Sequence, residues 1–161
     1  MRVTLTEPEF RICRWLATQR HSGARAAGVA DQQMGPQSAE QTDLDGIGGE
    51  FAFCKAANLY PDMTIGARAG GFDAQLHGMS VDVKTTRYES GKLLATLGKS
   101  TASADIYVLV VGTIPEYRIA GWVHGVTLIH PRNIRDLGRG PGYALDQRDL
   151  LPARLLLRTG T

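Results

Sequence analysis

Apolar residues recur at helical spacing near the amino terminus of the chain, whereas in its middle they alternate with polar residues or run together. The segment from about 6 to 30 opens with a hydroxyl, two acids and a proline, which favour the first turn of a helix. Phe10, Cys13 and Leu16 follow at intervals of three, so the pattern predicts an amphipathic helix against the core. The polar stretch from about 31 to 43 predicts a mobile loop.

A second helix is predicted around Glu50. A glycine-rich stretch precedes Glu50, and helix-compatible residues such as Phe51 and Cys54 follow it, so the pattern predicts a loop that opens a helix. The pair Pro61-Asp62 comes next, and we interpret Asp62 as a turn residue because proline often follows a helix end. Residues 63 to 68 are compatible with a first strand.

The run from 71 to 84 predicts a β-hairpin. Residues 72 to 76 are strand-compatible, and His77-Gly78 supplies a turn. Side chains alternate between the faces of a strand, so the two valines after the turn can be buried while Asp82 and Lys84 share the other face. Asp73 is then expected on the neighbouring strand, beside Asp82.

Further strands are predicted downstream. Residues 106 to 111 form a continuous apolar, largely β-branched run that is typical of a central buried strand. Residues 116 to 123 predict another strand, and between 90 and 103 the pattern fits a short helix or a strand equally well. In the 116 to 123 strand, one face would carry Tyr117, Ile119 and Gly121, and the other Arg118, Ala120 and Trp122. This order of elements predicts an α/β fold with a mixed central β-sheet flanked by helices.

Composition narrows the class of protein. A chain of 161 residues with 43% hydrophobic content fits a single domain, residues 1 to 161, with its own core. Because no apolar run approaches ~20 residues and no signal sequence opens the chain, we expect a soluble, cytoplasmic protein without a membrane partner. Cys13 and Cys54 lack zinc-type spacing and are interpreted as reduced, buried thiols. The net charge of +2 gives little support for nucleic-acid binding by itself, and Arg20 and Arg25 are interpreted as solvent-exposed.

The hairpin also carries candidate chemistry. Carboxylates on adjacent strands, at Asp73 and Asp82, resist joint ionisation unless a cation lies between them. Mg²⁺ suits this position, because it takes oxygen ligands and keeps water positions open for a phosphate. Lys84 would stand beside the metal, and Glu50 could reach the same charged face from its helix.

The ordered set Glu50, Asp73 and Asp82-Val83-Lys84 resembles the PD-(D/E)xK nucleases, the restriction-endonuclease-like superfamily, and in particular its small phage-type members. The resemblance covers roughly residues 44 to 123 and implies the restriction-endonuclease-like fold. It further implies a Mg-dependent deoxyribonuclease, with Mn possible. Glu50, Asp73, Asp82 and the carbonyl of Val83 would bind the metal, and Lys84 would assist the attacking water.

Two further expectations concern individual residues. A literal Pro-Asp pair occurs at Pro61-Asp62, but the family's aspartate lies close to the acid-x-lysine strand, which favours Asp73 over Asp62. Beyond that strand, nucleic-acid contacts could come from Thr85, Thr86 and Arg87.

Other functions remain open at this stage. An acid and a lysine two positions apart on a strand also form ordinary surface ion pairs. The alternatives are therefore a catalytically inactive nucleic-acid-binding or assembly protein on the same fold, and a nuclease specific for junctions or flaps. The expected partner is DNA, with RNA not excluded, and a homodimer would serve cleavage of both strands. A phage-encoded chain would act in the host cytoplasm.

Overall fold

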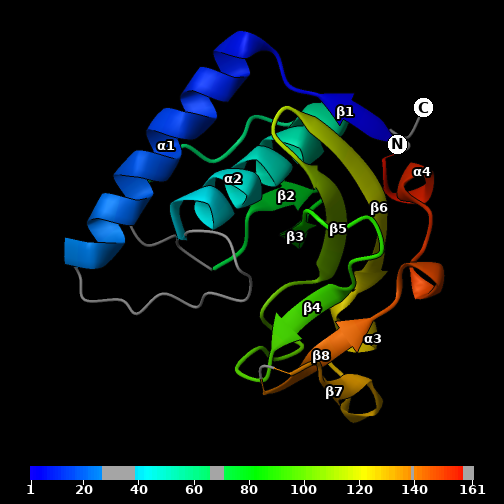
Figure 1. The fold of residues 1–161 in the computed structure, drawn as a ribbon. Coiled ribbons are helices and arrows are strands. Elements are labelled where there is room, and N and C mark those ends of the chain that lie inside the picture. Colours follow the sequence, from blue (N-terminus) through cyan, green and yellow to red (C-terminus); the bar gives the residue numbers. More distant parts are fainter. Residues whose placement is uncertain (27–38, 66–70, 139, 158–161) are drawn as a thin grey trace.

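The computed structural model describes residues 1–26, 39–65, 71–138 and 140–157 (Figure 1). The helices in chain order are α1 (Glu7–Ala26), α2 (Ala39–Ala56), α3 (Gly125–Leu128) and α4 (Ala153–Leu156), with 3₁₀ turns η1 (Pro131–Asn133) and η2 (Gln147–Asp149). The strands are β1 (Arg2–Thr4), β2 (Ala74–Leu76), β3 (Met79–Thr86), β4 (Leu93–Thr96), β5 (Ile106–Thr113), β6 (Glu116–His124), β7 (Ile134–Asp136) and β8 (Pro141–Leu145).

A mixed five-stranded sheet forms the centre of the fold, in the order β1-β6-β5-β3-β2. The strands β3 and β5 run parallel, and all other neighbours in this sheet are antiparallel. The strand β5 lies in the middle and is buried from Ile106 to Val111, as its apolar sequence predicts. The prediction of a mixed α/β fold is therefore confirmed.

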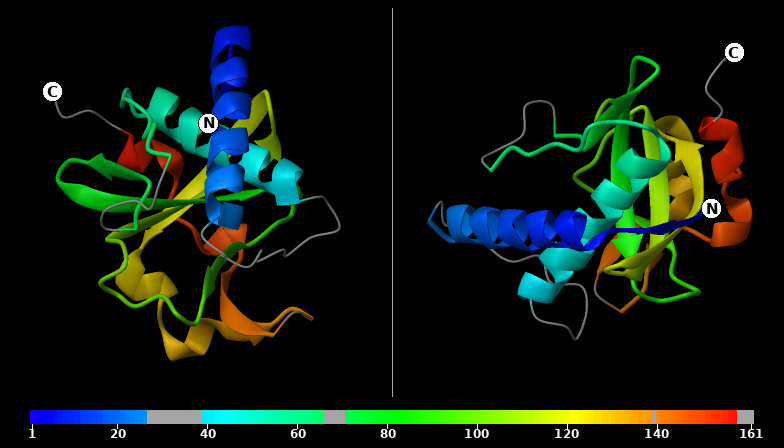
Figure 2. Two further views of the ribbon diagram at one scale, coloured as in Figure 1. Left: turned by 90° about the vertical axis from the view of Figure 1, so that its left-hand side faces the viewer. Right: turned by 90° about the horizontal axis from the view of Figure 1, so that it is seen from above.

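Each face of the central sheet packs against a different layer. On one face, Val81 and Val83 of β3 join a core with residues of α1 and α2, including Leu16 and Phe53. On the other face, Tyr107 joins a second core with residues of the small sheet β4-β8-β7. Figure 1 shows the two helices on one side of the central sheet, and Figure 2 shows the same layers from two further directions.

The helix α2 begins earlier than the sequence predicts. Residues 39 to 43 are helical, so the predicted loop is wrong there, and residues 31 to 38 lie outside the described residues. Consequently Glu50 lies well inside α2 and not near its start. The glycines are needed for packing, because a Cβ at Gly48 would lie 2.1 Å from Tyr117 Oη and one at Gly49 would lie 2.0 Å from Thr85 Oγ1. Glycine here permits close approach of a helix to a sheet.

The first helix agrees with its prediction over the described residues. Glu9 Oε2 accepts hydrogen bonds from both the N–H and the hydroxyl of Thr6, so the acid reaches back to the residue before the helix. The helix α1 ends at Ala26 in the described structure, and residues 27 to 30 lie outside it. Cys13 and Cys54 are buried free thiols, as expected.

Strand predictions are confirmed in part. Residues 63 to 65 are not a strand, and 66 to 70 lie outside the described residues. The ambiguous stretch contains the strand β4, which pairs with β8. The predicted alternation in β6 is wrong after Ala120, because the pairing with β5 shifts register at Leu109/Val110 and inserts one extra residue. As a result, Trp122 packs in the same core as Tyr117 and Ile119.

Within the described ranges, none of the helices combines the length and the apolar character that crossing a membrane requires.

Candidate functional site

The predicted hairpin is present, and its turn fixes the register of the two acids. His77 has φ of 51° and Gly78 has φ of 79°, so both turn residues occupy the left-handed region that two-residue hairpins favour. Ala74 of β2 lies opposite Val81 of β3. Asp73 therefore stands just before β2, at the position that faces Asp82.

Asp73 is bound to the backbone on both sides of Asp82. Its N–H donates to the carbonyl of Val81 at 2.9 Å, and its Oδ2 accepts from the N–H of Val83 at 2.7 Å. In a strand, the N–H and C=O of one residue point to the same edge. The carbonyl of Val83 therefore points to the edge of β3 where the Asp73 carboxylate lies.

Asp82 is a buried carboxylate with two cationic neighbours. Its side chain is 2% exposed, Lys84 Nζ lies 2.5 Å from Oδ1, and Lys99 Nζ donates to Oδ2 at 2.8 Å. The contact with Lys84 lacks hydrogen-bond geometry, so Oδ1 is a buried oxygen without a hydrogen-bond partner in the described part of the chain. The sequence predicted Lys84 beside Asp82 but not Lys99.

Tyr107 lies beside Asp82 on the neighbouring strand. The two residues are partners in the parallel pairing of β3 and β5, so their side chains share one face of the sheet. The Tyr107 hydroxyl is buried and has no hydrogen-bond partner among the residues described. Burial and then the negative charge of Asp82 raise the pKa of Tyr107 to about 12, so the hydroxyl keeps its proton at neutral pH.

Glu50 is held on the helix side of the sheet. Its Oε2 accepts from Arg20 Nη1 at 3.3 Å, and both side chains are 17% exposed. Arg20 also donates to the carbonyls of Asp62 and Thr64, at 2.9 Å each. The expectation that Arg20 is solvent-exposed is therefore wrong, because it ties α1 to α2 and to the segment that follows α2. Arg25 has no described side chain.

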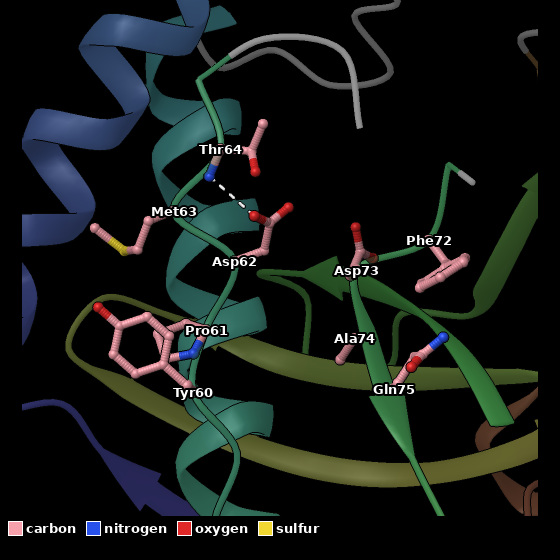
Figure 3. A pocket seen from close by; sticks show the side chains of 9 residues that line it. All are labelled: Tyr60, Pro61, Asp62, Met63, Thr64, Phe72, Asp73, Ala74 and Gln75. Carbon is pink, nitrogen blue, oxygen red and sulfur yellow. Dashed lines mark hydrogen bonds between the residues drawn. The ribbon is translucent and has the colours of Figure 1, made fainter. Parts of the chain in front are cut away.

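A pocket of about 490 Å³ opens where this segment faces the start of the hairpin (Figure 3). The lining residues are Tyr60, Pro61, Asp62, Met63, Thr64, Phe72, Asp73, Ala74 and Gln75. Asp62 and Asp73 come from its two walls, and Asp62 Oδ1 accepts from the N–H of Thr64 at 2.9 Å. Asp62 thus caps a local turn, whereas Asp73 contacts the strand that carries Asp82.

A model described as a family of unknown function, DUF5843, matches residues 1–118. The chain belongs to this family. Its matched region contains α1, α2, the hairpin, the turn that carries Lys99 and the strand β5, and so includes every residue of the candidate site. Searches of curated proteins and of solved structures find no match.

Asp73 and Asp82 supply the carboxylate oxygens at this site that could hold a cation. Across residues 1–26, 39–65, 71–138 and 140–157, no three histidine, cysteine, aspartate or glutamate side chains are arranged to hold a metal. Mg²⁺, however, is commonly bound by one or two carboxylates together with waters and substrate phosphates. Asp73 and Asp82 are the two carboxylates here that could hold such an ion, whereas Glu50 pairs with Arg20 on the helix side of the sheet.

The residues predicted to contact nucleic acid lie on opposite faces of the central sheet. Arg87 Nη2 donates to the buried Asp45 of α2 at 2.9 Å, and Thr85 also faces α2 beneath Gly49. Thr86 follows the face of Lys84, and its Oγ1 accepts from the N–H of Tyr88 at 3.3 Å. Only Thr86 therefore shares a face with Lys84.

Three residues at the site were not assigned to it from the sequence. Lys99 and Arg20 reach their acids across 17 and 30 positions, and no local pattern signals such contacts. The apolar run from 106 to 111 predicts a buried position for Tyr107, and its burial confirms this. Its place beside Asp82 follows only from the parallel register of β3 and β5.

Proposed function

We propose that the protein is a Mg²⁺-dependent nuclease that hydrolyses phosphodiester bonds in DNA, on a restriction-endonuclease-like fold in the cytoplasm. The observation that carries the proposal is the hydrogen bonding of Asp73 to the backbone on both sides of Asp82, with Lys84 Nζ 2.5 Å from the Asp82 carboxylate. The order of a helix, a hairpin and a parallel strand in this mixed sheet supports it.

Each residue of the site has a role under this proposal. Asp73 and Asp82 bind the cation, and the carbonyl of Val83 is a further oxygen ligand at the same strand edge. A bound Mg²⁺ supplies a water of lowered pKa and offsets negative charge on the phosphate. Lys84 orients the attacking water and stabilises the charge that develops on the phosphate, for which an ammonium on a flexible stem is suited.

Glu50 acts from further away than the other acids. Because its carboxylate accepts a hydrogen bond from Arg20 on the helix side, we assign it a positioning role through Arg20 and no contact with the cation. Arg20 in turn holds the backbone of Asp62 and Thr64, which line the pocket beside Asp73. Thr86 is positioned for phosphate contact on the face of Lys84, whereas Thr85 and Arg87 would contact DNA only after leaving α2.

A panel of labelled substrates tests the proposal. Duplex, single-stranded, junction and flap DNA, with matched RNA, are incubated with and without Mg²⁺ and with Mn²⁺ as a substitute. We expect metal-dependent cleavage of at least one DNA substrate by the wild-type protein and its loss in Lys84→Ala. Cleavage of both strands of a duplex would indicate a homodimer with two active sites. A preference for branched DNA would indicate that the protein is a junction or flap nuclease. Absence of cleavage of every substrate would contradict the proposal.

A second candidate function is favoured by one observation. The cationic groups at these acids already belong to the chain, with Lys84 and Lys99 at Asp82 and Arg20 at Glu50. A non-hydrolysing DNA-binding or assembly protein would keep these ion pairs permanently. Calorimetric titration separates the two functions, because a nuclease site should bind Mg²⁺ or Mn²⁺ and lose that binding in Asp82→Asn.

A further inference from the structure

Asp82 carries one negative charge and has two ammonium groups beside it. Lys84 Nζ lies near Oδ1 and Lys99 Nζ donates to Oδ2, while the Asp82 side chain is only 2% exposed. The two lysine side chains are 35% and 27% exposed, so their stems lead toward solvent. Asp82 itself therefore has one more cationic neighbour than its single charge requires.

The turn that presents Lys99 is held in place by hydrogen bonds. The N–H of Lys99 donates to the carbonyl of Thr96 at 3.1 Å. In the next turn, the N–H of Ser103 donates to the carbonyl of Ser100 at 3.0 Å. The end of this segment is fixed to the start of β3, because Asp105 Oδ2 accepts from both the N–H and the hydroxyl of Ser80. The contact of Lys99 with Asp82 is thus built into the fold.

A divalent cation bound at Asp82 would lie a few ångströms from both ammonium groups. Repulsion between like charges at such a distance costs several kcal/mol at intermediate dielectric. Lys84 is fixed on the same strand as Asp82 and faces the same side. Lys99 comes from a surface turn and ends on the other carboxylate oxygen, Oδ2. Its flexible four-carbon stem can turn outward into solvent without moving β3.

We infer that Lys99 is a resident counter-ion of Asp82 which a divalent cation displaces when it binds. This inference rests on the metal site of the proposed function. Lys99 keeps the buried carboxylate paired and ordered while no metal is bound, and it lowers the affinity of the site for Mg²⁺ by competing for Oδ2. Lys84, in contrast, remains beside Asp82 in both states.

Calorimetric titration of Mg²⁺ in the absence of DNA tests this inference independently of cleavage. We expect Lys99→Met to bind Mg²⁺ about tenfold more tightly than wild type, because one competing charge is removed. Lys92→Met is the matched control, since Lys92 pairs with Asp146, has a similar exposure and lies away from Asp82; its affinity should equal that of wild type. Lys99→Arg keeps the charge and should remain close to wild type, and Lys99→Gln, which removes the charge and should show the same gain, serves as the second variant if Lys99→Met does not fold. The double variant with Asp82→Asn should lose the gain.

The outcomes separate this inference from the proposed function. An unchanged Mg²⁺ affinity in Lys99→Met, with DNA cleavage by the wild-type protein, overturns the role of Lys99 alone. Tighter binding in Lys99→Met without cleavage by the wild-type protein supports the role of Lys99 and contradicts the nuclease. No cation binding by any of these variants overturns both.

Discussion

The central residue of the site is Asp82, a buried acid on the face of the sheet that also carries Tyr107. Burial of a carboxylate is unfavourable unless it is paired, and the two lysines meet that need from different elements. Removing one lysine leaves the other in place. The structural role of these two lysines can therefore be tested separately from a catalytic role of Lys84.

Lys84→Ala should leave the fold intact and abolish cleavage. Lys99 still pairs with Asp82 in this variant, so the thermal unfolding temperature should stay within a few degrees of wild type. The cleavage rate should fall at least about a hundredfold, as expected when a group that stabilises the transition state is lost. Initial rates on a labelled DNA and a thermal melt measure the two effects. Lys92→Ala is the control, and a Lys84→Ala rate within a few-fold of wild type would contradict the assigned role.

The positions of the hairpin acids could be predicted from the sequence, because they depend only on side-chain alternation and on the turn between the two strands. Side-chain alternation puts Asp82 and Lys84 on one face, and the His77-Gly78 turn fixes which residue faces Asp82. The partners of these acids could not be placed. Lys99 reaches Asp82 from a turn after β4, and its position depends on a second sheet that the sequence did not predict.

At the level of the elements, α2 is the least expected part of the fold. Three glycines between 46 and 50 predicted a loop, because glycine is a poor helix former. In the structure they lie inside the helix, and Gly48 and Gly49 face side chains of the central sheet at very short range. Tertiary packing overrides local propensity at these positions. The register shift in β6 is likewise a property of strand pairing and has no local sequence signal.

Gly48→Ala should destabilise the protein, whereas Gly46→Ala should stabilise it. A Cβ at position 48 would lie 2.1 Å from Tyr117 Oη, whose hydroxyl donates to the carbonyl of Asp45, so we expect a loss of about 1–3 kcal/mol. Gly46 has nothing within 4 Å of its added Cβ and should gain up to ~1 kcal/mol in helix propensity. Urea unfolding of both variants measures the difference. Equal effects of the two substitutions would show that α2 does not pack as described.

For the molecule as a whole, the two cores contain weak acids that are neutral in the folded state. Burial, with smaller contributions from Glu9 and Glu50, raises the pKa of the Cys13 thiol to about 12. Burial is also the main cause that raises the pKa of Tyr117 above its usual range, and that of Tyr107 to about 12. Each of these groups stays protonated in the folded protein at a pH where it ionises in the unfolded chain.

The free energy of unfolding should therefore fall as the pH rises above about 9. Below that pH the thiol and the hydroxyls are protonated in both states and contribute their full stability. Between about 9 and 12 the unfolded chain releases protons that the folded protein keeps, which favours unfolding. Urea midpoints at a series of pH values measure the slope, and Tyr107→Phe should reduce it. A midpoint that does not decrease between pH 8 and 11 would contradict this description of the cores.

The central claim is that Asp73 and Asp82 form one cation site, and locating a bound cation tests it most directly. Crystals soaked in Mn²⁺ would reveal the ion by its anomalous scattering. We predict a single strong peak about 2 Å from a carboxylate oxygen of each aspartate, with Lys99 turned away from Asp82. A peak at other residues, or none at a Mn²⁺ concentration that supports cleavage, would contradict the claim.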